Sequence, residues 1–405
     1  MQRVLILGAG FAGLWSAVGA ARACNERAIG PDRVDITVAN ATSWHSIRVR
    51  NYEADLSGTR ALLTDILEPI GVNLVVGKVT DISVGERIVT CTTTEGSLRL
   101  DYERMVFALG SLLVRPPIPG LGEYAFDVDT YEAALRLEAH LASLIHRPRS
   151  AGRETVLVIG AGLTGIEVAT EMASRLKSVH VILADRAAWI GSDMGDSARP
   201  VIAQALTALG VETRSGITVS AIDAAGADLS TGERIAAETV VWCAGMEASP
   251  LTACFPVARD RVGRLPVHPS LQIDGLTSEF AAGDAAWFAI DGTHSCVMSC
   301  QHARPMGRFA GHNVICDLLG EPMLPLAIDW YATILDLGRW GAVYTEGWDR
   351  QVVAQGAAAK LTKETINRKR IYPPLSRDRQ EILAAAAPVV QTPPAYSRAT
   401  AAPAA

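Results

Sequence analysis

The sequence has 405 residues, of which 49% are hydrophobic and 20% are charged. A chain of this length and composition can bury a large core and exceeds one ordinary domain, so two or three domains are expected. The 37 lysine and arginine residues against 43 aspartate and glutamate residues give a net charge of −6, which provides no general attraction for nucleic acid or anionic lipid.

The N-terminus and the cysteine content indicate a cytoplasmic protein. A strand is expected from Arg3 onward, which leaves no room for a signal peptide, and no apolar run approaches the roughly 18 residues of a membrane-spanning helix. The seven cysteines are an odd number and are expected to be reduced thiols. At most, we expect peripheral contact with the inner face of a membrane.

A glycine-rich turn follows the first apolar run, residues 4–7. Its G-x-G-x-x-G spacing predicts a buried parallel strand, a tight turn and the start of a helix. The first glycine allows the turn, the second lets a pyrophosphate approach the backbone, and the third lets the helix pack on the strand. Phosphates would then meet free N–H groups at the positive end of the helix. The motif comprises Gly8, Gly10, Phe11, Ala12 and Gly13.

A helix is expected over residues 14–28 and a second strand over 34–38. An acidic residue commonly ends this strand and binds a ribose, but here the position is Asn40, whose amide can still form a hydrogen bond with a hydroxyl. Residues 72–108 are predicted to form short strands that close at Gly110. The prolines of residues 115–120 then predict a linker, because they cannot continue a helix or a central strand.

The same theme returns at residue 156. A second apolar strand leads into a second G-x-G-x-x-G turn, and the next strand ends on the acidic Asp185. Two such units make a purely structural glycine turn improbable and favour two bound dinucleotides. The second motif comprises Gly160, Gly162, Leu163, Thr164 and Gly165.

The rest of the chain contains weaker signals. A buried strand is expected to end at Gly245, another ends at Gly283-Asp284, and a helix is predicted over 299–319. Residues 360–370 carry five basic residues with poor apolar periodicity and are interpreted as a solvated helix face. The Ala/Pro-rich residues 382–405 are predicted to be disordered.

Taken in order, four of these matches resemble the flavoproteins with two dinucleotide-binding domains, which include glutathione reductase, ferredoxin reductases and type II NADH dehydrogenases. The resemblance covers residues 1 to about 325. The resemblance rests on the two glycine units, the strand end at Ala108-Leu-Gly110 and the strand end at Gly283-Asp284. It implies an α/β fold with two Rossmann-like domains.

The resemblance also implies the cofactors. The first glycine unit and Asp284 would bind FAD, the second unit would bind NAD(P)H, and Glu167 would lie near the nicotinamide. The FAD-binding domain would then be split into residues 1–118 and 256–325, around an NAD(P)H-binding domain at 119–255. A C-terminal region, 326–381, and the tail, 382–405, would complete the chain.

The choice of nicotinamide cofactor can be argued from charge. The carboxylate of Asp185 would accept hydrogen bonds from a ribose 2′-hydroxyl and repel a 2′-phosphate, which favours NADH over NADPH. The neighbouring Arg186 is the counter-argument, since its guanidinium could accept the phosphate.

The chain lacks the redox-active cysteine pairs of disulfide reductases, which limits the reactions it can catalyse. There is no redox pair between Cys24 and Cys91 and no Cys-x-x-Cys, so both familiar disulfide mechanisms are disfavoured. The nearest resemblance is to the type II NADH dehydrogenases, in which electrons pass from NADH through flavin to a quinone or another small acceptor. Their Ala-Gln-x-Ala-x-Gln motif corresponds here to residues 300–305, in which Gln301 matches the first glutamine and Pro305 replaces the second.

Two alternatives stay open. Cys296 and Cys300 fall in the segment expected beside the flavin, so a flavin-dependent dithiol oxidase is one rival, although small cysteines often simply pack. The other is a redox-sensing flavoprotein without turnover. His302 is a candidate proton donor near the reduced flavin, against the ordinary expectation of a structural histidine.

The remaining candidates are few. His45, Arg48 and Arg50 follow the flavin-binding strand and either line the active-site side or provide surface charges with a buried imidazole. No spacing of His, Cys and Asp suggests a metal. The aromatic residues of the C-terminal region are interpreted as core or dimer-interface residues, so a homodimer stays open.

Overall fold

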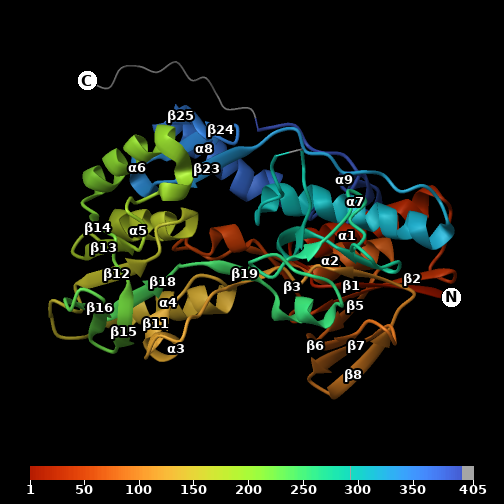
Figure 1. Cartoon of the computed structure of the whole chain (residues 1–405), viewed down its shortest axis with the longest axis horizontal. Coiled ribbons are helices and arrows are strands. Elements are labelled where there is room, and N and C mark those ends of the chain that lie inside the picture. The colour runs from red at the N-terminus through yellow and green to blue at the C-terminus, as the bar shows by residue number, and fades with distance from the viewer. Residues whose placement is uncertain (292, 395–405) are drawn as a thin grey trace.

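Two five-stranded sheets organise the structure, a computed structural model that describes residues 1–291 and 293–394. In Figure 1 the sheets lie side by side along the long axis of the molecule, with the C-terminal strands above the second sheet. Each sheet is parallel and carries helices on its faces, which confirms the α/β fold class.

The first sheet combines strands that are far apart in the chain, in the order β21-β9-β1-β2-β5. Because β1 lies between two neighbours and under helices, its residues 4–7 are buried on both faces, which explains their continuous apolar run. The strands are β1 (Gln2–Leu7), β2 (Val34–Asn40), β5 (Asn73–Val76), β9 (Arg104–Phe107) and β21 (Glu279–Ala281).

Helices α1 (Phe11–Glu26) and α7 (Cys300–Leu319) pack against each other on this sheet. Their backbones touch through glycines: a Cβ added to Gly307 would lie 2.2 Å from the carbonyl oxygen of Ala12, and one added to Gly311 would lie 2.1 Å from that of Ser16. Only glycine permits this approach. The helices predicted over 14–28 and 299–319 are confirmed.

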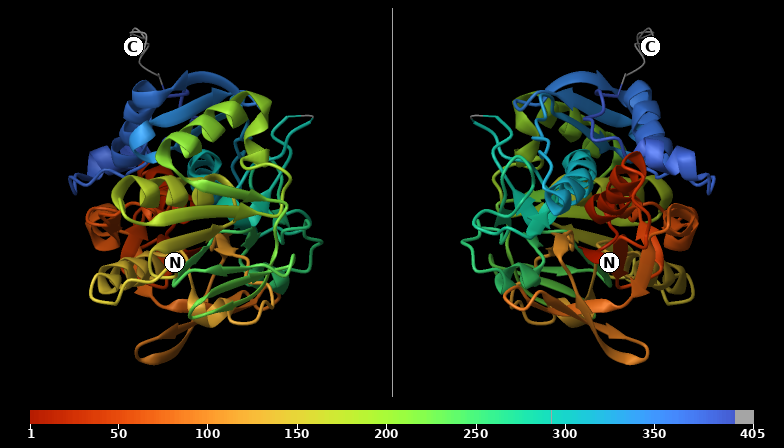
Figure 2. Two further views of the ribbon diagram at one scale, coloured as in Figure 1. Left: turned by 90° about the vertical axis from the view of Figure 1, so that its left-hand side faces the viewer. Right: turned by 90° about the vertical axis from the view of Figure 1, so that its right-hand side faces the viewer.

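Smaller elements complete the first half. An antiparallel sheet of β6, β7 and β8 projects away from the C-terminal region, at the bottom of Figure 2. The elements are β3 (Trp44–Ser46), β4 (Arg60–Leu62), α2 (Leu63–Leu67), β6 (Lys78–Ser83), β7 (Ile88–Thr93), β8 (Gly96–Asp101), β20 (Leu265–Pro266) and β22 (Ala286–Trp287).

The second sheet has the order β11-β18-β12-β13-β14. A short antiparallel ladder of β10 and β19 lies where the chain passes between the two sheets. The elements of this half are β10 (Ser111–Leu113), α3 (Leu121–Tyr124), β11 (Ala125–Phe126), α4 (Tyr131–Leu144), β12 (Thr155–Ile159), α5 (Leu163–Arg175), β13 (His180–Asp185), α6 (Gly195–Leu209), β14 (Glu212–Ser215), β15 (Val219–Asp223), β16 (Gly226–Leu229), β17 (Arg234–Ala236), β18 (Thr239–Trp242) and β19 (Met246–Ala248).

The C-terminal region packs on the second sheet's helices. Leu335, Leu337 and Val343 join the hydrophobic core that contains residues of α5 and α6. A π-helical turn, Ile366–Arg370, continues α8. The elements are β23 (Ala332–Asp336), β24 (Ala342–Glu346), β25 (Gln351–Gln355), α8 (Gly356–Thr365) and α9 (Arg379–Ala385).

The prediction of a disordered tail from residue 382 is wrong for residues 382–394. Ile382 and Leu383 belong to α9 and are buried in the core that also contains α1. The side chain of Asp378 caps α9 by accepting the N–H of Glu381, a local signal that precedes the apolar pair. Residues 395–405 lie outside the described part of the chain.

In the part of the chain that the structure describes, no helix has both the length and the apolarity needed to span a bilayer.

Candidate functional site

Three glycines shape the turn between β1 and α1. Gly8 has φ 90°, and a Cβ added to Gly13 would lie 1.9 Å from the carbonyl oxygen of Gly8, so the close approach of helix and turn requires glycine. Gly10 differs, because its φ of −70° suits any residue and no described atom lies within 4 Å of an added Cβ. The protein itself does not require glycine at this position, and the open space before its backbone suits a pyrophosphate.

The turn between β12 and α5 repeats this geometry. Gly160 has φ 101°, and a Cβ on Gly165 would lie 1.7 Å from the carbonyl oxygen of Gly160. Gly162 has φ −72° and, among the described residues, nothing within 4 Å of an added Cβ. The chain therefore has two open phosphate cradles of the same construction, at the starts of α1 and α5.

Asn40 and Asp185 end the strands that follow each turn. The Oδ1 atom of Asn40 accepts the N–H of Ala9 at 2.9 Å, and the carboxylate of Asp185 accepts the N–H groups of Ala161 at 2.5 Å and Ala187 at 2.7 Å. Each side chain thus holds the glycine turn of its own unit. Only Asp185 adds a negative charge.

Asp284 lies just beyond the end of β21 and meets the first half of the chain. It accepts a hydrogen bond from the hydroxyl of Ser111 at 2.6 Å. Arg48 donates to the carbonyl oxygen of Ser111 at 3.0 Å and forms an ion pair with Asp129. Burial raises the pKa of Asp284, against the hydrogen bond from Ser111. The predicted Gly110, Gly245 and Gly283 lie in the loops that follow β9, β18 and β21.

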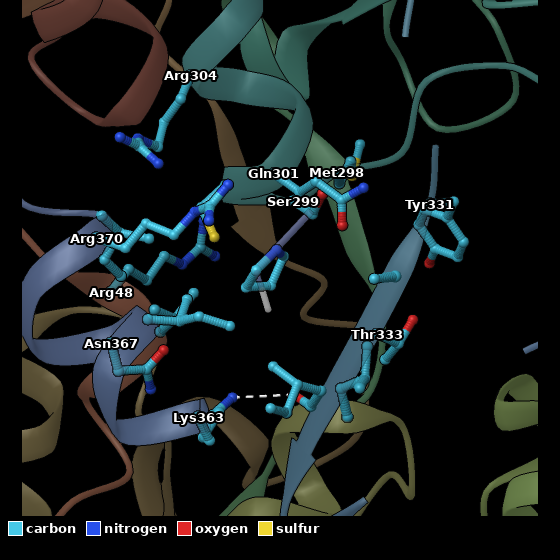
Figure 3. Close-up of a pocket in the computed structure, with 18 of the residues that line it drawn as sticks. Arg48, Met298, Ser299, Gln301, Arg304, Tyr331, Thr333, Lys363, Asn367 and Arg370 are labelled. Carbon is cyan, nitrogen blue, oxygen red and sulfur yellow. Dashed lines mark hydrogen bonds between the residues drawn. The ribbon is translucent and has the colours of Figure 1, made fainter. Parts of the chain in front are cut away.

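A cavity of about 290 Å³ lies where these segments converge (Figure 3). Its walls come from the start of α7, the start of α5, residues 330–334, the end of α8 with its π-helical turn, and residues 390–394. The predicted residues Arg48, Leu163, Thr164, Glu167, Cys300 and Gln301 all line it.

A buried ion pair crosses the cavity floor. The Nζ atom of Lys363 donates to Oε1 of Glu167 at 2.7 Å, drawn as the dashed line in Figure 3, and both side chains are 8% exposed. Burial raises the pKa of Glu167, against the opposing effect of the ammonium group. Burial also opposes the charge of Lys363, but Glu167 raises its pKa overall. The pair joins α5 of the second unit to α8.

A second charged group adjoins this pair. The carboxylate of Asp336 accepts from Nζ of Lys360 at 2.6 Å and from the hydroxyl of Tyr52 at 3.0 Å, while its N–H donates to Glu167 at 3.1 Å. Burial, followed by the neighbouring carboxylates, raises the pKa of Tyr52 well above its usual value. The loop that contains Tyr52, helix α5 and the C-terminal region therefore contribute to one polar network.

The interpretation of residues 360–370 as a solvated helix face is wrong for Lys360 and Lys363, whereas Arg368 and Lys369 are exposed. Lys363 and Asn367 are buried, and Lys360 is paired with Asp336. The prediction relied on the spacing of apolar residues within this segment. That spacing does not reveal the carboxylates of Glu167 and Asp336, which lie on other elements and pair with its lysines.

The start of α7 places Cys300 and Gln301 in the cavity wall. Gln301 donates to the carbonyl oxygen of Trp330 at 3.3 Å. Pro305, which replaces the second glutamine of the resembled motif, also lines the cavity. The position that carries that glutamine is therefore an apolar part of the wall.

The two thiols of the dithiol alternative differ in position. Cys296 lies outside the cavity lining, is 2% exposed and donates to the carbonyl oxygen of Ala286 at 3.4 Å. Burial raises the pKa of both Cys296 and Cys300, which disfavours a reactive thiolate. Both cysteines are free thiols. The geometry favours packing for Cys296.

His302 is fully buried and lies outside the cavity lining. Its Nδ1 atom accepts the N–H of Val297 at 2.9 Å, and burial lowers its pKa to about 4. The imidazole is neutral near pH 7 and holds the loop that precedes α7.

The remaining candidates have structural partners. His45 is fully buried, with Nδ1 bonded to the carbonyl oxygen of Ala9 at 2.8 Å, and its ring packs edge-on against Phe11. Arg50 forms an ion pair with Glu53. Within residues 1–291 and 293–394, no group of three or more His, Cys, Asp or Glu side chains is arranged to hold a metal ion.

The model of the pyridine nucleotide-disulphide oxidoreductase family matches residues 2–307. The chain belongs to this family. Its members are enzymes, and this chain is an oxidoreductase.

Several relatives of this pyridine nucleotide-disulphide oxidoreductase carry related names. An NADH dehydrogenase-like protein of Mycobacterium tuberculosis is 54% identical over 403 residues, which cover 97% of this chain and 100% of that protein. A type II NADH:quinone oxidoreductase of Staphylococcus saprophyticus is 25% identical and covers 92% of this chain and 95% of its own. The family resemblance seen in the sequence is confirmed.

Solved structures confirm the fold. NDH2 from Plasmodium falciparum superposes with a TM-score of 0.78 at 13% identity, covering 95% of this chain and 97% of that chain. The sulfide:quinone oxidoreductase of Aquifex aeolicus gives a TM-score of 0.73 at 17% identity, covering 95% of this chain and 93% of that chain.

Sequence reasoning missed several residues of the site in this oxidoreductase. Lys363, Asp336 and Tyr52 were not predicted, because each is recognised only through a partner distant in sequence. Arg304 and Arg308 were also missed, although their spacing of four on a predicted helix was a signal that both face one side.

Proposed function

We propose that the chain is an FAD-dependent NAD(P)H oxidoreductase that oxidises NADH and reduces a quinone or another small acceptor in the cavity. The observation that carries the proposal is the pair of open cradles at Gly10 and Gly162, where neither the backbone conformation nor a neighbouring atom requires glycine. The names of the relatives, NADH dehydrogenase-like protein and type II NADH:quinone oxidoreductase, support the same reaction.

The residues present fit FAD at the first cradle. Gly10 leaves room for the pyrophosphate, the N–H groups at the start of α1 point to it, and Asp284 supplies a carboxylate at the end of β21 for hydroxyl groups of the flavin chain. When bound, the flavin supplies the hydride-accepting and electron-donating chemistry.

The second cradle fits the nicotinamide substrate. Gly162 leaves room for its pyrophosphate, and Asp185 would accept from a ribose hydroxyl and repel a 2′-phosphate. Arg186 is exposed and therefore free to turn away from this position. These features support NADH over NADPH.

The cavity supports an acceptor with an apolar body. Glu167 and Leu163, on the helix that starts at the second cradle, and Gln301, on α7, share its wall. Glu167 and Lys363 are positioned to hold or donate a proton beside an acceptor, because their ion pair is buried and borders the cavity.

Anaerobic addition of NADH to the purified protein tests the proposal. The visible flavin band should bleach within seconds, and a neutral naphthoquinone should restore it. The Gly162→Ala variant should stay yellow yet resist bleaching at low NADH concentration. A colourless protein that refuses added FAD, or a yellow protein that NADH never bleaches, would refute the reductase and leave at most a flavin-binding sensor.

A further inference from the structure

One end of the cavity carries three arginines. Arg304 and Arg308 lie one turn apart on α7, and Arg370 ends the π-helical turn after α8. Figure 3 shows Arg304 and Arg370 on one side of the cavity, opposite Tyr331 and Thr333. Positive charge is therefore concentrated on one wall.

None of these arginines is paired with a carboxylate in the described part of the chain. Arg304 donates to the amide oxygen of Gln391 at 2.9 Å, and Arg370 donates to the carbonyl oxygen of Thr392. Within residues 1–291 and 293–394, the buried Nε atom of Arg308 has no hydrogen-bond partner, and its guanidinium lies over the ring of Trp15. Residues 292 and 395–405 contain no aspartate or glutamate. The chain's own acidic side chains therefore leave this charge uncompensated.

Burial makes the uncompensated charge costly. Arg304 is 6% and Arg308 2% exposed, and each lies over the ring of Trp15, at 5.3 and 4.4 Å from the centroid. Burial and mutual repulsion lower the pKa of Arg304 to about 9, and burial with the charge of Arg370 lowers that of Arg308 to about 10. Both groups are still protonated at pH 7. A buried, unpaired cation is strongly unfavourable unless an anion completes it.

The other cations of the cavity show the contrast. Arg48 is paired with Asp129, and Lys363 with Glu167. The excess charge is thus confined to the end formed by the three arginines. Guanidinium groups are well suited to bind carboxylate, sulfonate or phosphate oxygens, since they donate in a planar fork.

The rest of the cavity suits a ring. Trp330, Tyr331 and Tyr52 contribute aromatic walls, and Ile334 and Ile366 contribute aliphatic ones. An apolar cavity of about 150 Å³ is enough for benzene. The volume of about 290 Å³ found here therefore admits a larger ring system.

We propose that this cavity binds an amphipathic anion, a ring compound whose acidic group meets Arg304, Arg308 and Arg370. In the reaction proposed above, the electron acceptor would then be a quinone-like compound with an acidic substituent, and that part rests on the proposed function. Binding of the anion does not rest on it.

Equilibrium binding to the flavin-loaded protein tests the proposal without turnover. The probes are 2-naphthoate and 2-naphthamide, which have nearly the same shape and differ in charge, measured by calorimetry. We expect 2-naphthoate to bind about 30-fold more tightly, the effect of one buried charge pair. Equal affinities, or tighter binding of the amide, would overturn the proposal. If decanoate binds more tightly than 2-naphthoate, the proposal that the anion is a ring compound is wrong, and the cavity suits an acyl chain instead.

Variants locate the effect. Arg308→Met and Arg304→Met should each weaken 2-naphthoate about 30-fold, because each removes a guanidinium that meets the carboxylate, and should change the affinity for the neutral 2-naphthamide far less. Arg27→Met is the matched control, since Arg27 is paired with Glu321 and lies outside the cavity lining. It should leave both affinities unchanged. Equal losses in all three variants would assign the effect to net charge and overturn the site.

Stability separates a ligand site from a structural role. Without ligand, Arg308→Met should unfold at the same or a higher temperature, because it removes a buried unpaired cation. A lower unfolding temperature with unchanged preference for 2-naphthoate would assign the arginine to packing on Trp15. If NADH fails to bleach the flavin while 2-naphthoate still binds selectively, the reductase proposal fails and the anion site stands.

Discussion

The two glycine units of this chain have almost the same geometry but differ at the end of the following strand. In both, the third glycine touches the first and the second faces open space. Asn40 holds the first turn with a neutral amide, whereas Asp185 holds the second with a carboxylate. The comparison shows that the side chain at the strand end has two separable roles. One of its oxygens accepts a backbone N–H and fixes the turn, which an amide and a carboxylate do equally well. The charge of the side chain affects only which nucleotide is bound.

The largest expected effect comes from the glycines that both units require. Gly13→Ala and Gly165→Ala each place a Cβ within 2 Å of a carbonyl oxygen, so we expect each to lose about 3 kcal/mol of unfolding free energy. Chemical denaturation measures this. Gly122→Ala is the control, because no described atom lies within 4 Å of its added Cβ. If Gly13→Ala is as stable as this control, the close approach of Gly13 to the carbonyl oxygen of Gly8 is contradicted.

The open glycines should separate the units by ligand. Gly10→Ala should fold normally but lose flavin, whereas Gly162→Ala should keep flavin and bind NADH about 100-fold more weakly, roughly 2.7 kcal/mol. Flavin content and NADH titration provide the two measurements. A shared loss of flavin in both variants would contradict the assignment of one ligand to each cradle.

Acid should weaken the first unit through His45. The pKa of His45, lowered to about 4 by burial, lies below the usual value of about 6.5. As the pH falls below 6.5, His45 binds a proton in the unfolded chain but stays neutral in the folded chain. The unfolding free energy should therefore be about 2 kcal/mol lower at pH 5 than above pH 6.5.

Urea denaturation at pH 7 and pH 5 measures this loss. The His45→Gln variant can still donate to the carbonyl oxygen of Ala9 but cannot titrate, so its unfolding free energy should fall by about 2 kcal/mol less than that of the unmodified protein. The exposed His146→Gln serves as the control. Identical pH dependence in both variants would show that His45 does not titrate in this way.

The smallest effect should follow from making the second unit like the first. Asp185→Asn can still accept the N–H of Ala161 but no longer repels a 2′-phosphate, so the preference for NADH over NADPH should fall about tenfold in kcat/KM. Asp193→Asn, a change at an exposed acid, should leave it unchanged. An unaltered ratio in Asp185→Asn would place the selector elsewhere.

Local signals explain which parts of the fold the sequence could predict. Gly8 and Gly160 each follow a continuous apolar run, so strand, turn and helix were predicted from neighbouring residues and are confirmed. The end of α9 was missed because the Ala-rich composition after Ile382 outweighed the capping signal at Asp378.

The site was predicted only where a motif marks it. Gln301 and Glu167 follow motifs and line the cavity. Lys363 was interpreted as solvated because its partner, Glu167, lies on a distant helix, and a charge run alone does not show which of its members is buried. The unpaired Arg308 is likewise visible only once Trp15 and the cavity surround it.

The contact of α1 with α7 through Gly307 and Gly311 has a mechanical consequence. With peptide groups in direct contact, neither helix can slide without colliding with the other, so the two helices form one stiff platform. Any opening that admits an acceptor must then come from the rest of the cavity's covering, which is formed by residues 330–334, the end of α8 and residues 390–394. We expect hydrogen exchange to be slow in the platform and faster in that covering.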